Sequence, residues 1–448
     1  MSLYSTSIAT AIIDPSFTST RRCEFRIPFK NQAYLPNLRL GNVGVTVNAT
    51  TAYALGCGVS GIIKRIVLLD GEEEIDSLRE ANAWLTFKSF MRPNTEAESI
   101  KIPLEGGGGR GFTSSTSMEV AVPAPFQKYA TVAGDNVNSH LHTGTIDLRT
   151  VFPILNSITH LSTNTFQNLR IVIEYETDQA RIVVDTTQQA IPVVPILMAD
   201  EITDEALIAT LDKQLMANPV FWDTIEVDRI GLKAIQGAGA DLTSQQISLQ
   251  SNGFLGKYVK RLCIQKSPQD PSLNVINGLV QGFGGNGSVS QHSEQINLRV
   301  NGRSLVGGQG YVTPAQIAMA VSDTWGELNC PPYGAIESVG LDGAGVAIVN
   351  APAGVAPTEP SLLISANAAT ARHSPTTGQL SYCAFRVDSR MDALQIEYGR
   401  SGRLQSVTAP NTTPGQGGTA VALDLTVYAE VSRSLMVMGG GQWKIQYV

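Results

Sequence analysis

Apolar and polar residues alternate with a period of two along much of this chain, and that pattern predicts a protein made mainly of β-strands. Residues 23–29 alternate in this way near the start, and residues 225–228 repeat the rhythm early in the second half. Because successive side chains of a strand point to opposite faces, each run predicts a half-buried strand. Further alternating runs occupy residues 169–176, 296–301, 394–398, 423–428 and 443–447. Gly, Pro, Asn and Ser separate the runs, as in antiparallel sheets joined by turns.

The second half of the chain reads as a loose copy of the first. The segment at 62–68, Ile-Ile-Lys-Arg-Ile-Val-Leu, returns at 258–264 as Tyr-Val-Lys-Arg-Leu-Cys-Ile. The segment at 169–175, Leu-Arg-Ile-Val-Ile-Glu-Tyr, returns at 425–431 as Leu-Thr-Val-Tyr-Ala-Glu-Val, in the same order. A chain of 448 residues also suits two domains of roughly 200 residues each. We therefore expect one β-domain used twice in tandem.

The two copies differ in length. The paired segments start 107 residues apart in the first half, from 62 to 169, and 167 residues apart in the second, from 258 to 425. We place most of the additional residues at 333–378, a stretch rich in Ala, Gly, Pro, Asn and Thr. Long insertions in a compact domain are usually functional or mobile, so we expect an exposed projection there.

Only three segments have convincing helical patterns, which favours a mainly β protein over alternating strands and helices. The first helix is predicted to begin at a capping-box pair, Ser77 and Glu80, and to reach about Phe90. The second follows Thr203, has its apolar residues on one face, and links the two copies. The third spans about 313–325 and begins with Thr-Pro, a favourable start for a helix.

The composition indicates a surface suited to burial against other proteins. Charged residues make up only 16% of the chain, so its polar surface can be buried at little desolvation cost. The net charge of −7 argues against an electrostatic clamp on nucleic acid, which would need clustered Lys and Arg. No apolar run approaches the ~18 residues of a membrane span, and residues 1–17 lack the pattern of a secretory signal.

The cysteines do not form a recognisable framework. They are odd in number and far apart in the sequence, which argues against disulfide bonds and against zinc spacing. We interpret them as small buried hydrophobic residues in a reducing compartment. The five are Cys23, Cys57, Cys263, Cys330 and Cys383.

Two glycine-rich runs resemble phosphate-binding loops only in spacing. The run at 106–111 and the run at 282–287 are not followed by the helical pattern that a phosphate or dinucleotide loop requires. Loop glycines explain both runs, so we predict turns. No nucleophilic Ser, Cys–His pair or spaced carboxylate pair stands out elsewhere. We therefore expect no catalytic residue, no cofactor and no enzyme activity.

The best candidates for a metal site are His140 and His142. Side chains two residues apart on a strand share a face, and Asp135 and His160 lie nearby in the sequence. The surrounding residues are polar and typical of a loop, which favours ordinary surface histidines. We therefore predict no metal site.

The two ends of the tandem carry distinctive motifs. Near the start, residues 61–71 are predicted to form a strand and glycine turn, followed by Glu74-Ile75-Asp76 and the helix with Trp84. Near the end, residues 425–430 are followed by 433–437 and by glycines 439–441 before a last strand. Together these motifs resemble those of the double jelly-roll major capsid proteins of eukaryotic DNA viruses. Ser432-Arg433 stands where many large-virus members have Asn, and the chain is short for the family. These departures favour the polinton-like viruses and virophage relatives.

The resemblance implies a fold of two tandem eight-stranded antiparallel jelly rolls with a few short helices. It implies a first jelly roll at 1–200, a linker helix at 201–218, and a second jelly roll at 219–448 with the insertion near 333–378. Three copies of such a chain would form a pseudo-hexagonal capsomer that tiles an icosahedral shell. Its partners would be itself, neighbouring capsomers, and penton and minor capsid proteins. It would be found in the virion after assembly in the host cytoplasm or nucleus.

Two other functions remain open at this stage. A two-domain β-sandwich can be a carbohydrate-binding protein or a glycoside-active enzyme, which would need converging carboxylates and aromatic platforms on one sheet. A minor vertex or spike protein of the same viral lineage would share the fold, and its copy number in particles would distinguish it.

Overall fold

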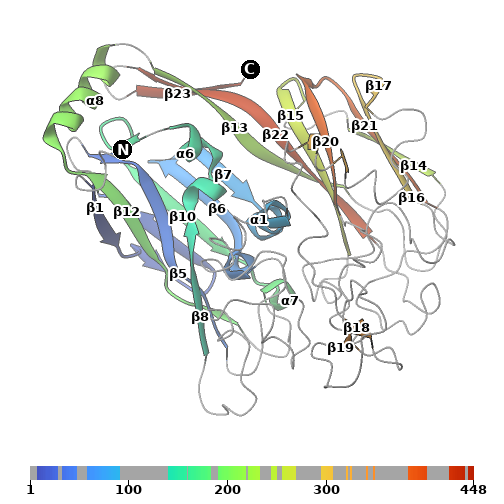
Figure 1. Cartoon of the computed structure of the whole chain (residues 1–448), viewed down its shortest axis with the longest axis horizontal. Coiled ribbons are helices and arrows are strands. Elements are labelled where there is room, and N and C mark those ends of the chain that lie inside the picture. The colour runs from blue at the N-terminus through green and yellow to red at the C-terminus, as the bar shows by residue number, and fades with distance from the viewer. Residues whose placement is uncertain are drawn as a thin grey trace.

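The computed structural model shows a protein built of antiparallel sheets in two halves that lie side by side (Figure 1). The structure describes residues 8–28, 33–47, 58–90, 140–158, 160–182, 190–217, 220–232, 244–249, 255–268, 294–305, 319–320, 323–324, 340–341, 347–348, 382–400, 423–438 and 442–447. Every alternating run named above falls on a strand of this structure, in whole or in large part. The prediction of a mainly β protein is therefore confirmed.

The first half contains two sheets packed face to face. One has the strand order β1 (Ile8–Ile13), β12 (Ile196–Ile202), β5 (Asn37–Val47) and β11 (Ile191–Pro192), with β8 (His140–Asp147) also paired to β5. The other has the order β2 (Phe17–Thr18), β3 (Arg22–Arg26), β10 (Leu169–Tyr175), β6 (Ile63–Asp70) and β7 (Glu73–Arg79). Short pieces complete this half: β4 (Tyr34–Leu35), β9 (Leu161–Ser162), η1 (Gly58–Ile62), α5 (Leu148–Val151), α6 (Pro153–Ser157) and α7 (Gln179–Ile182).

The second half has the strand order of a jelly roll. One sheet runs β13 (Val220–Leu232), β22 (Leu423–Met438), β15 (Tyr258–Pro268) and β20 (Tyr382–Arg390), with β23 (Gln442–Tyr447) paired to β22. The other runs β14 (Ser244–Leu249), β21 (Leu394–Arg400), β16 (Glu294–Val300) and β17 (Arg303–Ser304). A separate hairpin joins β18 (Gly340–Leu341) and β19 (Ala347–Ile348). In each large sheet early strands lie beside late ones, so the chain crosses repeatedly between the sheets, as in a jelly roll.

The segments that recur in the sequence also pair in the same way in both halves. In the first half β6 lies antiparallel to β10, and in the second half β15 lies antiparallel to β22. The residues identical between the copies form an equivalent ion pair across each ladder. Arg65 Nη1 lies 3.2 Å from Glu174 Oε1, and Arg261 Nη1 lies 2.9 Å from Glu430 Oε2. The tandem duplication inferred from the sequence is therefore repeated in strand pairing and side-chain contacts.

A β-bulge is duplicated together with these strands. In the first half the pairing skips Lys64, because Arg65 and the residue two before it face consecutive residues of β10. In the second half the pairing skips Lys260 in the same manner. A bulge adds one residue to one strand and increases the local twist, and it is a designed feature of a sheet. The Lys-Arg pair shared by both copies thus marks the point where each ladder bends.

The first predicted helix begins later than expected. α1 (Ala81–Phe90) starts after Glu80, so the prediction that Ser77 caps the helix is wrong. Ser77 instead belongs to β7, where it faces Val67 of β6 and its hydroxyl donates to Glu74. Glu80 has a positive φ of 50°, which turns the chain sharply from strand to helix. The hairpin ladder thus extends through the residues that the capping pattern assigned to the helix.

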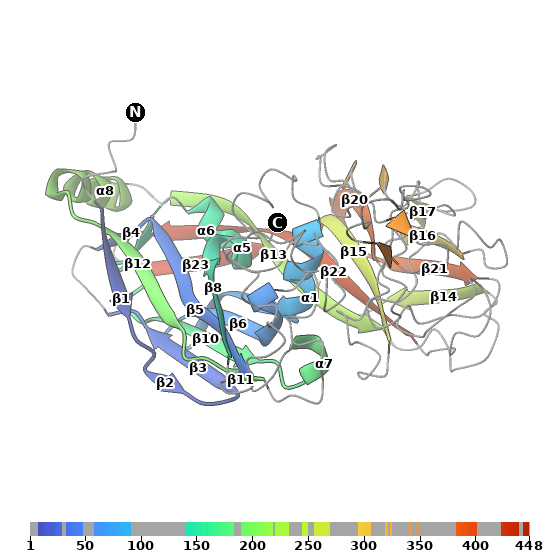
Figure 2. The ribbon, with the colours of Figure 1, turned by 60° about the horizontal axis from the view of Figure 1, so that its bottom comes forward.

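The second predicted helix is present. α8 (Glu205–Ala217) begins after Asp204, whose Oδ1 accepts hydrogen bonds from the backbone N–H groups of Ala206 at 2.9 Å and Leu207 at 3.2 Å. These bonds satisfy amide donors that the first turn leaves without partners. Figure 2 shows α8 at the end of the first half that is remote from the second. Most of the third predicted helix and of the insertion at 333–378 lies outside the described residues.

The core is continuous through both halves. Buried apolar residues of the four large sheets belong to one cluster, so the halves share their packing at the junction. Cys23, Cys263 and Cys383 are buried in this cluster and form no disulfide bond, which confirms the interpretation of these three as small buried hydrophobic residues. Cys57 and Cys330 lie outside the described residues.

Candidate functional site at the junction of the two halves

Three strands of the second half extend over the first half. Figure 1 shows β13 and β22 running from one half to the other, with β23 beside them above the first half. β13 contacts both β7 and α6 of the first half. The long strands therefore contact both halves and fix their relative position.

A buried ion pair lies in this junction. Arg433 on β22 places its Nη2 atom 2.7 Å from Oδ1 of Asp76 on β7, and the side chains are 4% and 0% exposed. Asp76 also accepts hydrogen bonds from the backbone N–H of Ser77 at 3.0 Å and of Ile154 at 3.2 Å. These two residues belong to the motifs at opposite ends of the chain that carry the resemblance to capsid proteins. The two motifs therefore meet in space.

A second carboxylate faces the same arginine. Glu226 on β13 has its Oε2 atom 3.7 Å from Nη1 of Arg433, and the same oxygen accepts a hydrogen bond of 2.7 Å from the Tyr447 hydroxyl. Burial, with the hydrogen bond to Glu226, raises the pKa of Tyr447. Among the described residues, Nε and Nη2 of Arg433 have no aligned hydrogen-bond acceptor. The guanidinium is thus held by close charge contacts rather than by a bidentate pair.

Burial dominates the electrostatics of Asp76. Removal from water raises the pKa of this carboxyl to about 7, although Arg433 and the backbone N–H of Ile154 act in the opposite direction. The nearby negative charge of Glu226 contributes to this rise, because it disfavours a second negative charge on Asp76. Asp76 therefore takes up a proton near neutral pH.

Aromatic contacts also join the two halves. The Trp84 ring of α1 lies 5.1 Å from the Tyr428 ring of β22, centroid to centroid. The Trp443 ring of β23 lies 5.6 Å from the Phe166 ring, and its Nε1–H donates to Asp70 Oδ2 at 2.8 Å. Tilted ring pairs at these distances add to the energy of apolar burial. Each contact joins one half to the other.

The residues weighed as metal ligands from the sequence lie partly within the described residues. His140 and His142 lie on β8, and His160 follows α6. Burial lowers the pKa of His160. Among the described residues no group of three or more His, Cys, Asp or Glu side chains could hold a metal ion. Asp135 and both glycine-rich runs lie outside the described residues.

The junction has the chemistry of a structural joint. Asp76 is fully buried, so it cannot touch a substrate, and the rings of Trp84 and Tyr428 at the junction pack against each other. Both motifs were recognised in the sequence, but no sequence feature predicted the contact between Asp76 and Arg433. In the described part of the chain, no helix has the length and apolar character that a membrane crossing requires.

Comparisons with known proteins agree with this architecture. No family model and no curated protein matches the chain. Among solved structures, a chain of the PBCV-1 virus capsid is 12% identical and matches over 98% of this chain and 97% of its own length, with a TM-score of 0.56. The mavirus major capsid protein is 9% identical over 100% of this chain and 91% of its own, with a TM-score of 0.55. A chain of the Sputnik virophage structure is 9% identical over 99% and 88%, also at 0.55.

These matches cover both halves and the strands that cross between them. Their identities are low, so the likeness is one of fold. The predicted fold class is confirmed: the chain has the double jelly-roll fold found in these viral capsid structures.

Proposed function

We propose that this chain is the major capsid protein of a eukaryotic DNA virus and that its role is structural. The observation that carries the proposal is the match of the whole chain, including the junction, to the mavirus major capsid protein and to the PBCV-1 capsid. A protein that used one jelly roll to bind a ligand would not need a second jelly roll fused through a shared core. The fused pair is the functional unit.

The geometry suits a homotrimer. Two similar sandwiches held side by side present similar walls, so three copies around an axis form a pseudo-hexagonal capsomer that can tile an icosahedral shell. We propose that the first jelly roll comprises residues 1–200 and the second 219–448, with residues 201–218 as the linker. The insertion at 333–378 would then extend from one end of the second jelly roll, where it does not disturb lateral packing.

The proposed partners follow from this role. The chain would contact its own copies within the trimer, neighbouring capsomers, and penton and minor capsid proteins, and it would be located in the virion. We propose that it acts without cofactor, metal or catalysis. It would not bind nucleic acid directly in a sequence-specific way, which accords with its net charge of −7.

The test is the assembly state of the purified full chain. Mass photometry should show a trimer, and negative-stain micrographs should show pseudo-hexagonal blocks or hexagonal plates. A chain that stays monomeric at micromolar concentration would contradict the proposal. A trimer that is present in only a few copies per purified particle would assign the chain to a vertex or spike. Binding to a glycan array by a monomer would favour the carbohydrate-binding alternative.

A further inference from the structure

One sheet of the first half carries an unusual outer face. Phe17, Arg22, Arg26 and Arg170 surround Glu24 there, and we call this set the arginine face. Phe17 is paired with Glu24 between β2 and β3, and Arg26 is paired with Arg170 between β3 and β10. Side chains of directly paired residues share a face, as do residues two apart on a strand. All five side chains therefore project from the same side of the sheet.

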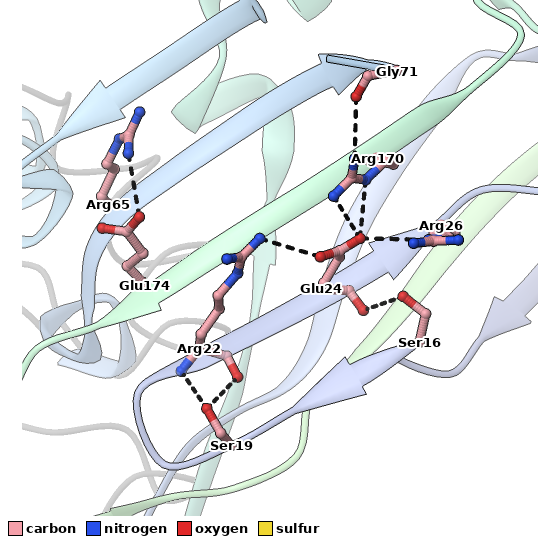
Figure 3. Close-up of polar contacts among 9 residues, drawn as sticks. All are labelled: Ser16, Ser19, Arg22, Glu24, Arg26, Arg65, Gly71, Arg170 and Glu174. Atoms are coloured by element: carbon pink, nitrogen blue, oxygen red, sulfur yellow. Dashed lines mark hydrogen bonds and ion pairs between the residues drawn. The ribbon is translucent and has the colours of Figure 1, made fainter.

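Glu24 holds the three arginines in place, as Figure 3 shows. Arg170 contributes the shortest contact, with Nη2 2.8 Å from Glu24 Oε1, and Arg22 and Arg26 lie 3.2 Å and 3.4 Å from the Glu24 carboxylate. The Arg22 side chain remains 46% exposed and that of Arg26 69%, while Phe17 is 51% exposed. The face thus presents preorganised donors beside an exposed aromatic ring, and preorganised side chains lose less entropy on binding.

The equivalent face of the second copy is covered by protein. The duplication relates Glu174 of β10 to Glu430 of β22, so Thr426, Tyr428 and Glu430 correspond to the outer face of β10. All three are buried, and the Tyr428 ring packs on Trp84 of the first half. In the second copy this face is therefore the one that joins it to the first copy.

We propose that the arginine face is a contact between subunits, on which the second jelly roll of a neighbouring copy of this chain packs. The proposal rests on the proposed function as a capsid trimer. In a trimer, first and second jelly rolls alternate around a ring. The face that the second jelly roll packs against the first jelly roll of its own chain is then matched by the equivalent face of the first jelly roll, which packs against the second jelly roll of the neighbouring subunit. The face of β22 forms the internal junction, so the matching face of β3 and β10 forms the external one.

The charge of the arginine face indicates which kind of surface can pack against it. Three arginines and one glutamate give the face a net charge of +2, and the chain as a whole has −7. The rest of the chain therefore has a net charge of −9. A neighbouring copy offers mostly carboxylates as ionic partners, and Arg with an exposed aromatic residue is typical of the centre of protein interfaces. We expect an acidic, partly apolar surface of the second jelly roll to cover Phe17, Arg22 and Arg26.

The test compares charge-reversed variants of the full chain by mass photometry. Arg22→Glu with Arg26→Glu should convert the trimer to monomer, or raise the concentration for half-assembly at least about tenfold, because like charges then face each other. Arg26→Glu alone is the second variant. It keeps the contacts of Arg22 and Arg170 with Glu24, so the sheet retains its internal pairs. Circular dichroism should show both variants folded.

A matched control exists on the second half. Arg386 and Arg390 lie on β20, four residues apart like Arg22 and Arg26. They form ion pairs with Asp388 and Asp392, and their side chains are 72% and 70% exposed. Arg386→Glu with Arg390→Glu changes the net charge by the same amount and should leave the trimer intact. A loss of trimer in this control as well would show a general effect of net charge and would overturn the proposal.

The remaining outcomes also decide the question. If the wild type is a trimer and the folded Arg22 and Arg26 variants remain trimers of unchanged stability, the contact is refuted and the proposed function stands. A monomeric wild type refutes the proposed function and the contact with it. If the wild-type trimer binds a short DNA duplex and the variants lose that binding without losing the trimer, the face is a nucleic-acid surface and the proposal fails.

Discussion

Replacing Asp76 by Asn should stabilise the folded chain at pH 8 and destabilise it at pH 4. Burial raises the pKa of Asp76 from 3.8 to about 7. The native state therefore binds a proton that the unfolded chain releases in this range, so stability from this group is fully present below pH 3.8 and is lost as the pH rises toward 7. Asn does not ionise, so the folding free energy of the variant does not fall in this pH range.

The magnitude follows from the same numbers. A rise of about three pKa units corresponds to about 4 kcal/mol of folding free energy, lost between pH 4 and pH 8. Asp76 accepts one backbone N–H on each oxygen, from Ser77 and from Ile154. Asn offers one oxygen, so one donor is left unpaired at a cost of about 1–3 kcal/mol. The variant should be less stable by about that amount at pH 4 and more stable by about 1–3 kcal/mol at pH 8.

The assay is urea unfolding followed by tryptophan fluorescence at pH values from 4 to 8. The difference in unfolding free energy between the variant and the wild type should change sign within this range. Asp204→Asn is the matched control, because Asp204 is exposed at the start of α8 and Asn caps a helix equally well. The reasoning is refuted if Asp76→Asn destabilises the protein at pH 8 by as much as at pH 4, since Arg433 would then outweigh burial.

Two further substitutions and one labelling experiment test the core and the helix cap. Trp84→Ala should lower the unfolding free energy by about 3–5 kcal/mol, because it removes a buried ring that packs on Tyr428 across the junction; urea unfolding measures it. Asp204→Ala should cost about 1 kcal/mol through loss of the α8 cap, and a midpoint equal to that of the wild type would contradict the cap. Burial raises the pKa of Cys23 to about 11, so iodoacetamide at pH 8 should label it only after unfolding, as peptide mass spectrometry can show.

The strands were predictable from the sequence because alternation reports directly on a half-buried sheet. The duplication was predictable because the copies kept the residues that pair across the ladder, Arg65 with Glu174 and Arg261 with Glu430. The bulges at Lys64 and Lys260 were not predicted, because a bulge depends on the register with the partner strand, which the sequence of one strand does not show.

The start of α1 shows where local signals fail. Ser77 and Glu80 have the spacing of a capping box, and the residues after them favour a helix. The hairpin of β6 and β7 competes for the same residues, and its ladder continues to Arg79. The ladder prevails because Ile75 and Leu78 of β7 are buried in the core that β6 also lines. A helix begun at Ser77 would have removed Leu78 from that core.

The junction could not be predicted, because sequence periodicity does not show what covers a polar face. Residues 423–428 alternate, and alternation predicts one buried and one exposed face. In the structure Leu425 and Val427 face the core of the second jelly roll, while Thr426 and Tyr428 on the other face are also buried. Alternation places Tyr428 on the face that is predicted to be exposed to solvent. Because its side chain has both an apolar ring and a polar hydroxyl, it can instead pack that ring against Trp84. A polar face on one copy of a duplicated strand thus becomes an internal contact, and its counterpart on the other copy is left available for a second chain.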